Sequence, residues 1–97
     1  MRDSLNEPVS VVMYYSASNK HVQPYQLHWQ GQIYKLDKVD FWHKTKAGDV
    51  LIHHFSIGDV GSTAYFKLAL DTASLHWTLE EYMTADQLEV TYERHEA

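Results

Sequence analysis

The sequence contains no cysteine and has only four glycines and two prolines in 97 residues. The absence of cysteine excludes disulfide bridges, a thiol nucleophile, an iron–sulfur cluster and a thiolate zinc site. It is also typical of a cytoplasmic protein, which is the location we expect. The small amount of glycine and proline, beside 44% hydrophobic residues, excludes collagen-like and low-complexity chains.

Long apolar runs are also missing. The longest one, residues 11–15, is far shorter than the ~20 residues that a membrane-spanning helix needs, and residues 1–10 hold no apolar signal segment. We therefore expect a soluble chain without a membrane partner. Its length fits one small β domain, residues 1–97, with a core at 9–83 and a C-terminal segment, 84–97, that reads as strand or as helix.

The net charge of −5 is spread unevenly along the chain. Residues 32–46 carry four lysines against two aspartates, whereas residues 80–97 carry six carboxylates against one arginine. Affinity for nucleic acid depends largely on lysine and arginine that neutralise phosphates. The acidic balance therefore makes nucleic acid an unfavourable partner.

Apolar and polar residues alternate along most of the chain, which is the pattern of half-buried β-strands. The alternation predicts strands at residues 9–15, 25–29, 32–44, 50–57, 64–70 and 75–80, and we favour a seventh around residues 88–92. Short turns join them, among them a two-residue turn at Gln30-Gly31. We expect an all-β fold of six or seven mostly antiparallel short strands, in a meander that forms a small barrel or a strongly bent sheet.

The phase of the alternation predicts which side chains point inward. The expected centre of the core is Leu27, Trp29, Tyr34, Leu36, Phe66, Leu68, Leu70, Trp77 and Leu79. The same phase directs Val9, Val11, Met13, Tyr15, Tyr25 and Leu75 inward. Between Leu36 and Val39 the apolar phase changes, and one extra residue there would turn both halves of the strand to one core. We therefore predict a β-bulge between Leu36 and Val39, with Phe41 inward beyond it.

Seven histidines raise the question of a metal site, since imidazole binds several transition metals. They are His21, His28, His43, His53, His54, His76 and His95. The adjacent pair His53 and His54 should project to opposite faces of a strand, and no His-x-His pair shares a face. We expect no catalytic, cofactor-binding or metal-binding residues. A small metal-dependent enzyme with histidines brought together across strands is an alternative.

Some aromatic residues fall out of phase with the core and should lie on the outside, near a lysine-rich stretch. The candidate interaction surface is Lys35, Lys38, Trp42, Lys44, Lys46 and Tyr65. Such a surface fits a protein partner or a second copy of the chain, which indicates a non-catalytic interaction or self-association module. The alternative is a single-stranded nucleic-acid binder that stacks bases along residues 35–46.

The spacing of several residues resembles a family of small bacterial all-β domains of unknown function. The motif is Leu27-x-Trp29-x-Gly31-x-x-Tyr34-x-Leu36-x-x-Val39-x-x-Trp42, then Tyr65-x-x-Leu68-x-x-Asp71 and Trp77-x-Leu79-Glu80. The resemblance covers about residues 25–83. It implies a bacterial β domain and supplies no catalytic residues. Some relatives are encoded near DNA-damage polymerases, but they are richer in arginine than this chain.

The charge distribution generates the first testable prediction. Because few phosphates can be neutralised, we expect no specific nucleic-acid binding tighter than about 10⁻⁴ to 10⁻⁶ M at physiological salt. Fluorescence anisotropy with labelled single-stranded and duplex oligonucleotides measures this affinity. Submicromolar binding that disappears when the four lysines of residues 35–46 are changed to glutamate would contradict it.

Overall fold

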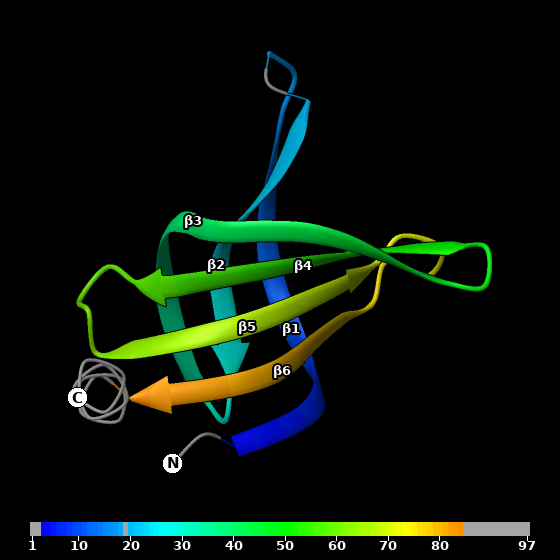
Figure 1. Cartoon of the computed structure of the whole chain (residues 1–97). Helices are drawn as coiled ribbons and strands as arrows, with labels where there is room; N and C mark the ends of the chain where they lie inside the picture. The colour runs from blue at the N-terminus through cyan, green and yellow to red at the C-terminus, as the bar shows by residue number, and fades with distance from the viewer. Residues whose placement is uncertain (1–2, 19, 85–97) are drawn as a thin grey trace, which may run out of the picture.

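The computed structural model describes residues 3–18 and 20–84, and within them the secondary structure consists of six strands. These are β1 (Asp3–Ser16), β2 (His21–Trp29), β3 (Gln32–Ala47), β4 (Val50–Asp59), β5 (Ala64–Asp71) and β6 (Trp77–Thr84). Each strand pairs antiparallel with the next, and β6 pairs with β1, so the sheet closes into a barrel (Figure 1). The predicted small all-β barrel is confirmed. The strand expected at 88–92 lies outside the described residues, and no helix within them could span a bilayer.

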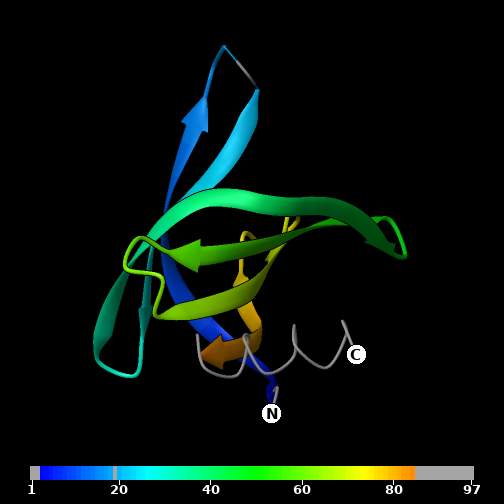
Figure 2. The same cartoon turned by 60° about the vertical axis from the view of Figure 1, so that its left-hand side comes forward.

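Two long strands change partners along their length, and this lets a sheet of six strands close. In β1, residues 3–9 pair with β6 and residues 10–16 pair with β2. In β3, the first four residues pair with β2, and the strand pairs with β4 from Leu36 to Ala47, with two irregularities. The end of β1 and the start of β2 therefore project together as a hairpin. The end of β3 and the start of β4 form a second hairpin that extends in a different direction (Figures 1 and 2).

The barrel encloses the predicted core. Its buried cluster consists of Leu27, Trp29, Leu36, Phe55, Ile57, Ala64, Phe66, Leu68, Leu70, Trp77 and Leu79. Phe66 is fully buried, and its ring lies 5.0 Å from the ring of Tyr34 and 5.7 Å from that of Tyr82, between centroids. Tyr34 is only partly buried, but it packs against the cluster, and burial raises the pKa of its hydroxyl, with Tyr82 and Asp59 adding to the effect. The inward phases predicted for β2, β5 and β6 are thus largely confirmed.

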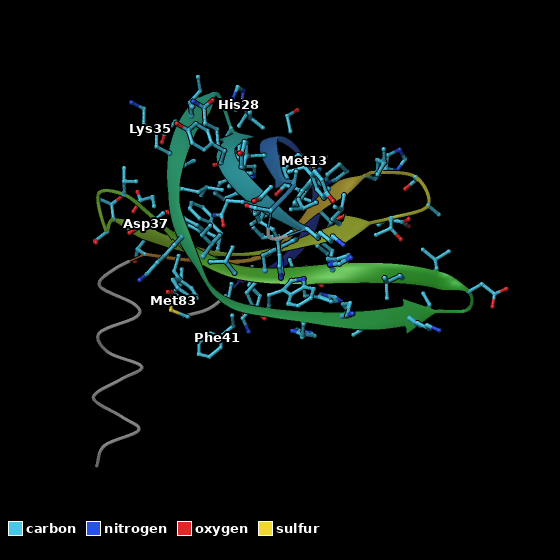
Figure 3. The ribbon with its side chains drawn as sticks, turned by 90° about the horizontal axis from the view of Figure 1, so that it is seen from above. Met13, His28, Lys35, Asp37, Phe41 and Met83 are labelled. Carbon is cyan, nitrogen blue, oxygen red and sulfur yellow. The ribbon has the colours of Figure 1, made fainter. Side chains whose placement is uncertain are left out.

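The predicted irregularity in β3 is present, and a second one follows it. The register against β4 shifts between Leu36 and Val39, as expected, and shifts again between Val39 and Phe41. The second shift reverses the phase once more, so the prediction that Phe41 points inward is wrong: its side chain is 71% exposed and points away from the sheet (Figure 3). Trp42 takes the position opposite Phe55 instead.

Three other side chains expected in the core are exposed because of where the β1–β2 hairpin runs. Met13 and Tyr15 belong to the part of β1 that continues along β2 after its pairing with β6 has ended, and both side chains are exposed. In the β1–β2 pairing a register shift leaves Tyr25 as an extra residue on β2. Pro24 occupies the buried position, and Tyr25 faces outward.

Leu75 is also exposed, because β6 begins later than the alternation predicted. The residue has a positive φ of 62° and lies in the turn before Trp77. Asp71 organises this turn by accepting the backbone N–H groups of Ser74 and Ala73, and these bonds lower the pKa of its carboxyl. A local side-chain-to-backbone network therefore replaces the first residues of the expected strand.

The two-residue turn between β2 and β3 has the predicted form. Trp29 pairs with Gln32, and the residues between them, Gln30 and Gly31, have φ values of 51° and 74°. Two positive φ angles are the requirement of a type I′ turn, whose twist matches that of the strands it joins. Glycine meets this requirement without steric cost.

The core assignment generates a prediction with an internal control. Phe66→Ala should lower the free energy of unfolding by about 3–5 kcal/mol, since it removes a fully buried ring and leaves a cavity. Phe41→Ala should change it by less than about 0.5 kcal/mol, because that ring is already in water. Urea denaturation of both variants measures the difference. Equal midpoints for the two variants would overturn the packing described here.

Candidate interaction surfaces

An aromatic cluster surrounds Trp42, where the far part of β3 passes β2. Its ring lies 4.5 Å from the ring of His21, edge to face, and 5.6 Å from the stacked ring of His53, between centroids. The Trp42 Nε1 donates a hydrogen bond of 2.8 Å to Nδ1 of His53, and Lys44 Nζ lies 5.4 Å from the centroid of the indole. Although Trp42 is 37% exposed, the indole is therefore engaged by its own neighbours.

The protonation state of His53 is tied to this cluster. Burial lowers the pKa of the imidazole, and the positive charge of Lys44 and the neighbouring His21 and His54 lower it further. Only the deprotonated Nδ1 accepts the indole N–H. The hydrogen bond and the direction of the pKa shift thus both favour a neutral His53 with its proton on Nε2.

His54 faces the other side of β4, as predicted for adjacent strand residues. Its ring stacks on that of His43 at 4.6 Å between centroids, and its Nδ1 lies 3.0 Å from Oε1 of Glu80. Its Nε2 lies 2.7 Å from the hydroxyl of Thr45. Across residues 3–18 and 20–84, no three histidine or acidic side chains lie together in a way that could hold a metal ion. Both ring nitrogens of His54 have protein partners instead.

The six residues predicted as an interaction surface lie in separate places along the molecule. Trp42 and Lys44 belong to the aromatic cluster. Lys38, which precedes them on β3, lines a hollow of 240 Å³ together with Tyr65 of β5. Lys35 is exposed beside β2, and Lys46 is exposed near the tip of the β3–β4 hairpin. The fold spreads the lysines along β3 and does not gather them into one patch.

The hollow beside Lys38 is acidic. Asp37, Asp40 and Asp59 line it together with the single lysine. The carboxylate of Asp59 accepts hydrogen bonds from the N–H and hydroxyl of Thr63, so it holds the β4–β5 turn. Three carboxylates around one ammonium group form an unfavourable place for a phosphate.

A surface that the sequence analysis did not select lies on the projecting end of β1 and β2. We call residues 12–16 and 21–25 the arm. Five of its apolar and aromatic side chains are exposed: Val12, Met13, Tyr14, Tyr15 and Tyr25. Tyr14 is 62% exposed and Tyr25 58%, and both line an open apolar hollow of 580 Å³ that also includes Gln23 (the arm points toward the viewer in Figure 3). This is the largest group of exposed apolar side chains among the described residues.

One sequence signal marks the arm. Between Glu7 and Lys35 the chain has a single Asp, Glu, Lys or Arg residue, Lys20, although 22% of all residues are charged. The alternation within this stretch predicts burial of every second residue, and it led us to expect Met13, Tyr15 and Tyr25 in the core, with Tyr14 out of phase on the outer face. The lack of charge is equally typical of a surface that becomes covered by another molecule.

The aromatic cluster generates a prediction about pH. A neutral His53 supports the fold above pH 6.5, the ordinary imidazole value, and this contribution is lost as the pH falls through the lowered pKa of the folded state. We expect the indole N–H resonance of Trp42 to shift and to exchange faster with water as the pH is lowered below 6.5. His53→Asn, whose amide oxygen takes the place of Nδ1, should remove the step, whereas His28→Gln at an exposed site should keep it. An unchanged step in His53→Asn would show that another histidine causes it.

Comparison of the chain with models of known protein families, with curated proteins and with solved structures finds no match. The resemblance in the motif spacing therefore stays a prediction.

Proposed function

We propose that the chain is a non-catalytic protein-interaction module that acts by burying its arm against another protein molecule. The observation that carries the proposal is the exposed aromatic and apolar surface of the arm, formed by side chains such as Tyr14 and Tyr25. As the wider setting we propose a bacterial cytoplasmic protein, on the motif resemblance and the absence of cysteine.

The stability of the arm supports this proposal. A two-stranded hairpin without a third strand or a packed layer is marginally stable in water. In the arm, Val22 of β2 packs against the core, but the residue opposite it on β1, Tyr15, is exposed, and so is Tyr14. A partner that covers the outer part would remove apolar surface from water and would order the hairpin.

The composition of the arm also fits a protein partner. Protein interfaces are enriched in tyrosine and methionine and poor in charged residues at their centre. The exposed residues 12–15 are Val-Met-Tyr-Tyr, with no charged residue among them. This pattern favours a protein surface over a phosphate backbone.

The nucleic-acid alternative has less support. It needs open aromatic rings beside a run of positive charge. Trp42 already contacts His21, His53 and Lys44, and the lysines of β3 alternate with Asp37 and Asp40. With a net charge of −5 over the whole chain, few phosphates would be neutralised.

A photo-crosslinking experiment tests the proposed function. We expect benzoylphenylalanine in place of Tyr14 to form protein adducts, either in the purified chain or in an extract of the source cells, because a covered arm holds a partner within reach of the probe. The matched control places the same probe at Ile33, which is 62% exposed, like Tyr14, but lies in the β2–β3 hairpin. Adduct formation is read as a change in mass on a denaturing gel.

The control decides how the result is read. Adducts from position 14 that are absent from position 33 support a covered arm, whatever the mass of the partner. Equal labelling at both positions, or no adduct in either preparation, would contradict the proposal.

A further inference from the structure

We infer that the molecule covering the arm is a second copy of this chain, and that the two copies pair β1 with β1, antiparallel, along residues 12–15. This inference rests on the proposed function and names its partner. It adds to the proposed function the strand edge that pairs, the antiparallel direction of the pairing and the two-fold symmetry of the dimer.

The first observation is an open strand edge. On one side of β1, pairing with β6 ends at Val9, which lies opposite Trp77. On the other side, pairing with β2 continues to Ser16. Within the described strands, residues 12–15 therefore pair along one edge only. The extra residue of the β1–β2 irregularity belongs to β2, so this part of β1 keeps a regular extended backbone.

The second observation is that the other open edges of the described strands carry features that hinder pairing. On β2, Pro24 lacks an N–H, and the Gln23 side chain donates to the carbonyl oxygens of Pro24 and Asp37. The open edge of β3 has two register irregularities and exposed lysines. Bulges, proline and lysine are the devices by which proteins protect sheet edges from other chains. Residues 12–15 of β1 contain none of them.

The third observation concerns charge, and it makes β1 a better edge than β3 for pairing with a second copy. Antiparallel pairing about a two-fold axis places residues of one copy opposite the same short segment of the other. Like charges in opposing positions destabilise such a pair. The edge of β3, with Lys44 and Lys46, would bring like charges together, whereas β1 brings together valine, methionine and tyrosine. The net charge of −5 makes most other approaches of two copies repulsive.

The pairing would also complete the arm. Each two-stranded arm would become half of a four-stranded antiparallel sheet in the order β2–β1–β1–β2. Tyr14 and Tyr25, which line the same hollow, would then be joined by the equivalent residues of the second copy. Three or more strands with a shared apolar face reach a stability that a two-stranded hairpin lacks.

A cysteine scan tests the pairing, and the chain suits it because it has no cysteine of its own. Single variants Val12→Cys, Met13→Cys, Tyr14→Cys and Tyr15→Cys are oxidised mildly, and disulfide-linked dimers are measured on non-reducing gels. In an antiparallel pair, the distance between equivalent residues grows by about 7 Å with each step from the axis. We therefore expect cross-linking to peak at one position, or at two neighbouring ones, and to fall on either side. Ile33→Cys and Val60→Cys, which are similarly exposed, are the controls.

Sedimentation velocity gives an independent measurement on the unmodified chain. We expect the average mass to rise with concentration toward that of a dimer. Tyr14→Glu should keep the chain monomeric, because it places two carboxylates near each other across the axis, whereas Ile33→Glu should leave association unchanged. Urea midpoints of the two variants verify that both are folded.

The outcomes separate this inference from the proposed function. A peaked scan together with concentration-dependent association supports both. A strict monomer with control-level cross-linking, but with arm adducts to other proteins, overturns the second copy and leaves the interaction module standing. A dimer that cross-links equally at all four positions, or most strongly at the controls, overturns the β1 pairing. The absence of every adduct and of association overturns both.

Discussion

The change of partner within β1 and within β3 is the constraint on which the rest of the structure depends. Closing a sheet of six strands into a barrel requires the strands to tilt and their hydrogen-bond register to stagger. In this barrel the two longest strands also change partners along their length. Residues 3–9 of β1 close the barrel against β6, and its remaining residues leave with β2. The two irregularities of β3 let it turn from β2 to β4. Closure of the barrel and projection of the arm are therefore two consequences of one geometry.

The irregularities also decide which side chains reach the core and which reach the surface. Two shifts in β3 expose Phe41 and place Trp42 opposite Phe55, at the margin of the core. There the indole meets His21 and His53, which join β2 and β4 to β3 through ring contacts and one hydrogen bond. A neutral imidazole is required for that bond, so the link between these strands depends on pH in the range where histidine titrates.

The distribution of charge makes two regions of the surface chemically different. Lysines and aspartates alternate along β3, where they protect an open edge and form an acidic hollow around Lys38. The arm contains no Asp, Glu, Lys or Arg residue and exposes tyrosines together with an open backbone edge. These two regions differ in what they can approach, and a protein interface fits the arm better than it fits β3.

The sequence by itself determined the strand pattern, the turn at Gln30-Gly31 and the inward phase of β5, because these follow from local alternation and from backbone conformation that glycine favours. It also indicated the first irregularity of β3, since the apolar phase changes between Leu36 and Val39. Only the tertiary structure decided where each strand leaves the barrel. Burial of Tyr15 or Tyr25 depends on whether another layer lies over that part of the strand, and alternation reports two faces without saying which one is covered. For that reason the exposure of the lysines and Trp42 could be predicted from the sequence. The exposure of Met13, Tyr15 and Tyr25 in the arm followed only from the tertiary structure, in which the β1–β6 pairing that closes the barrel ends before the arm begins.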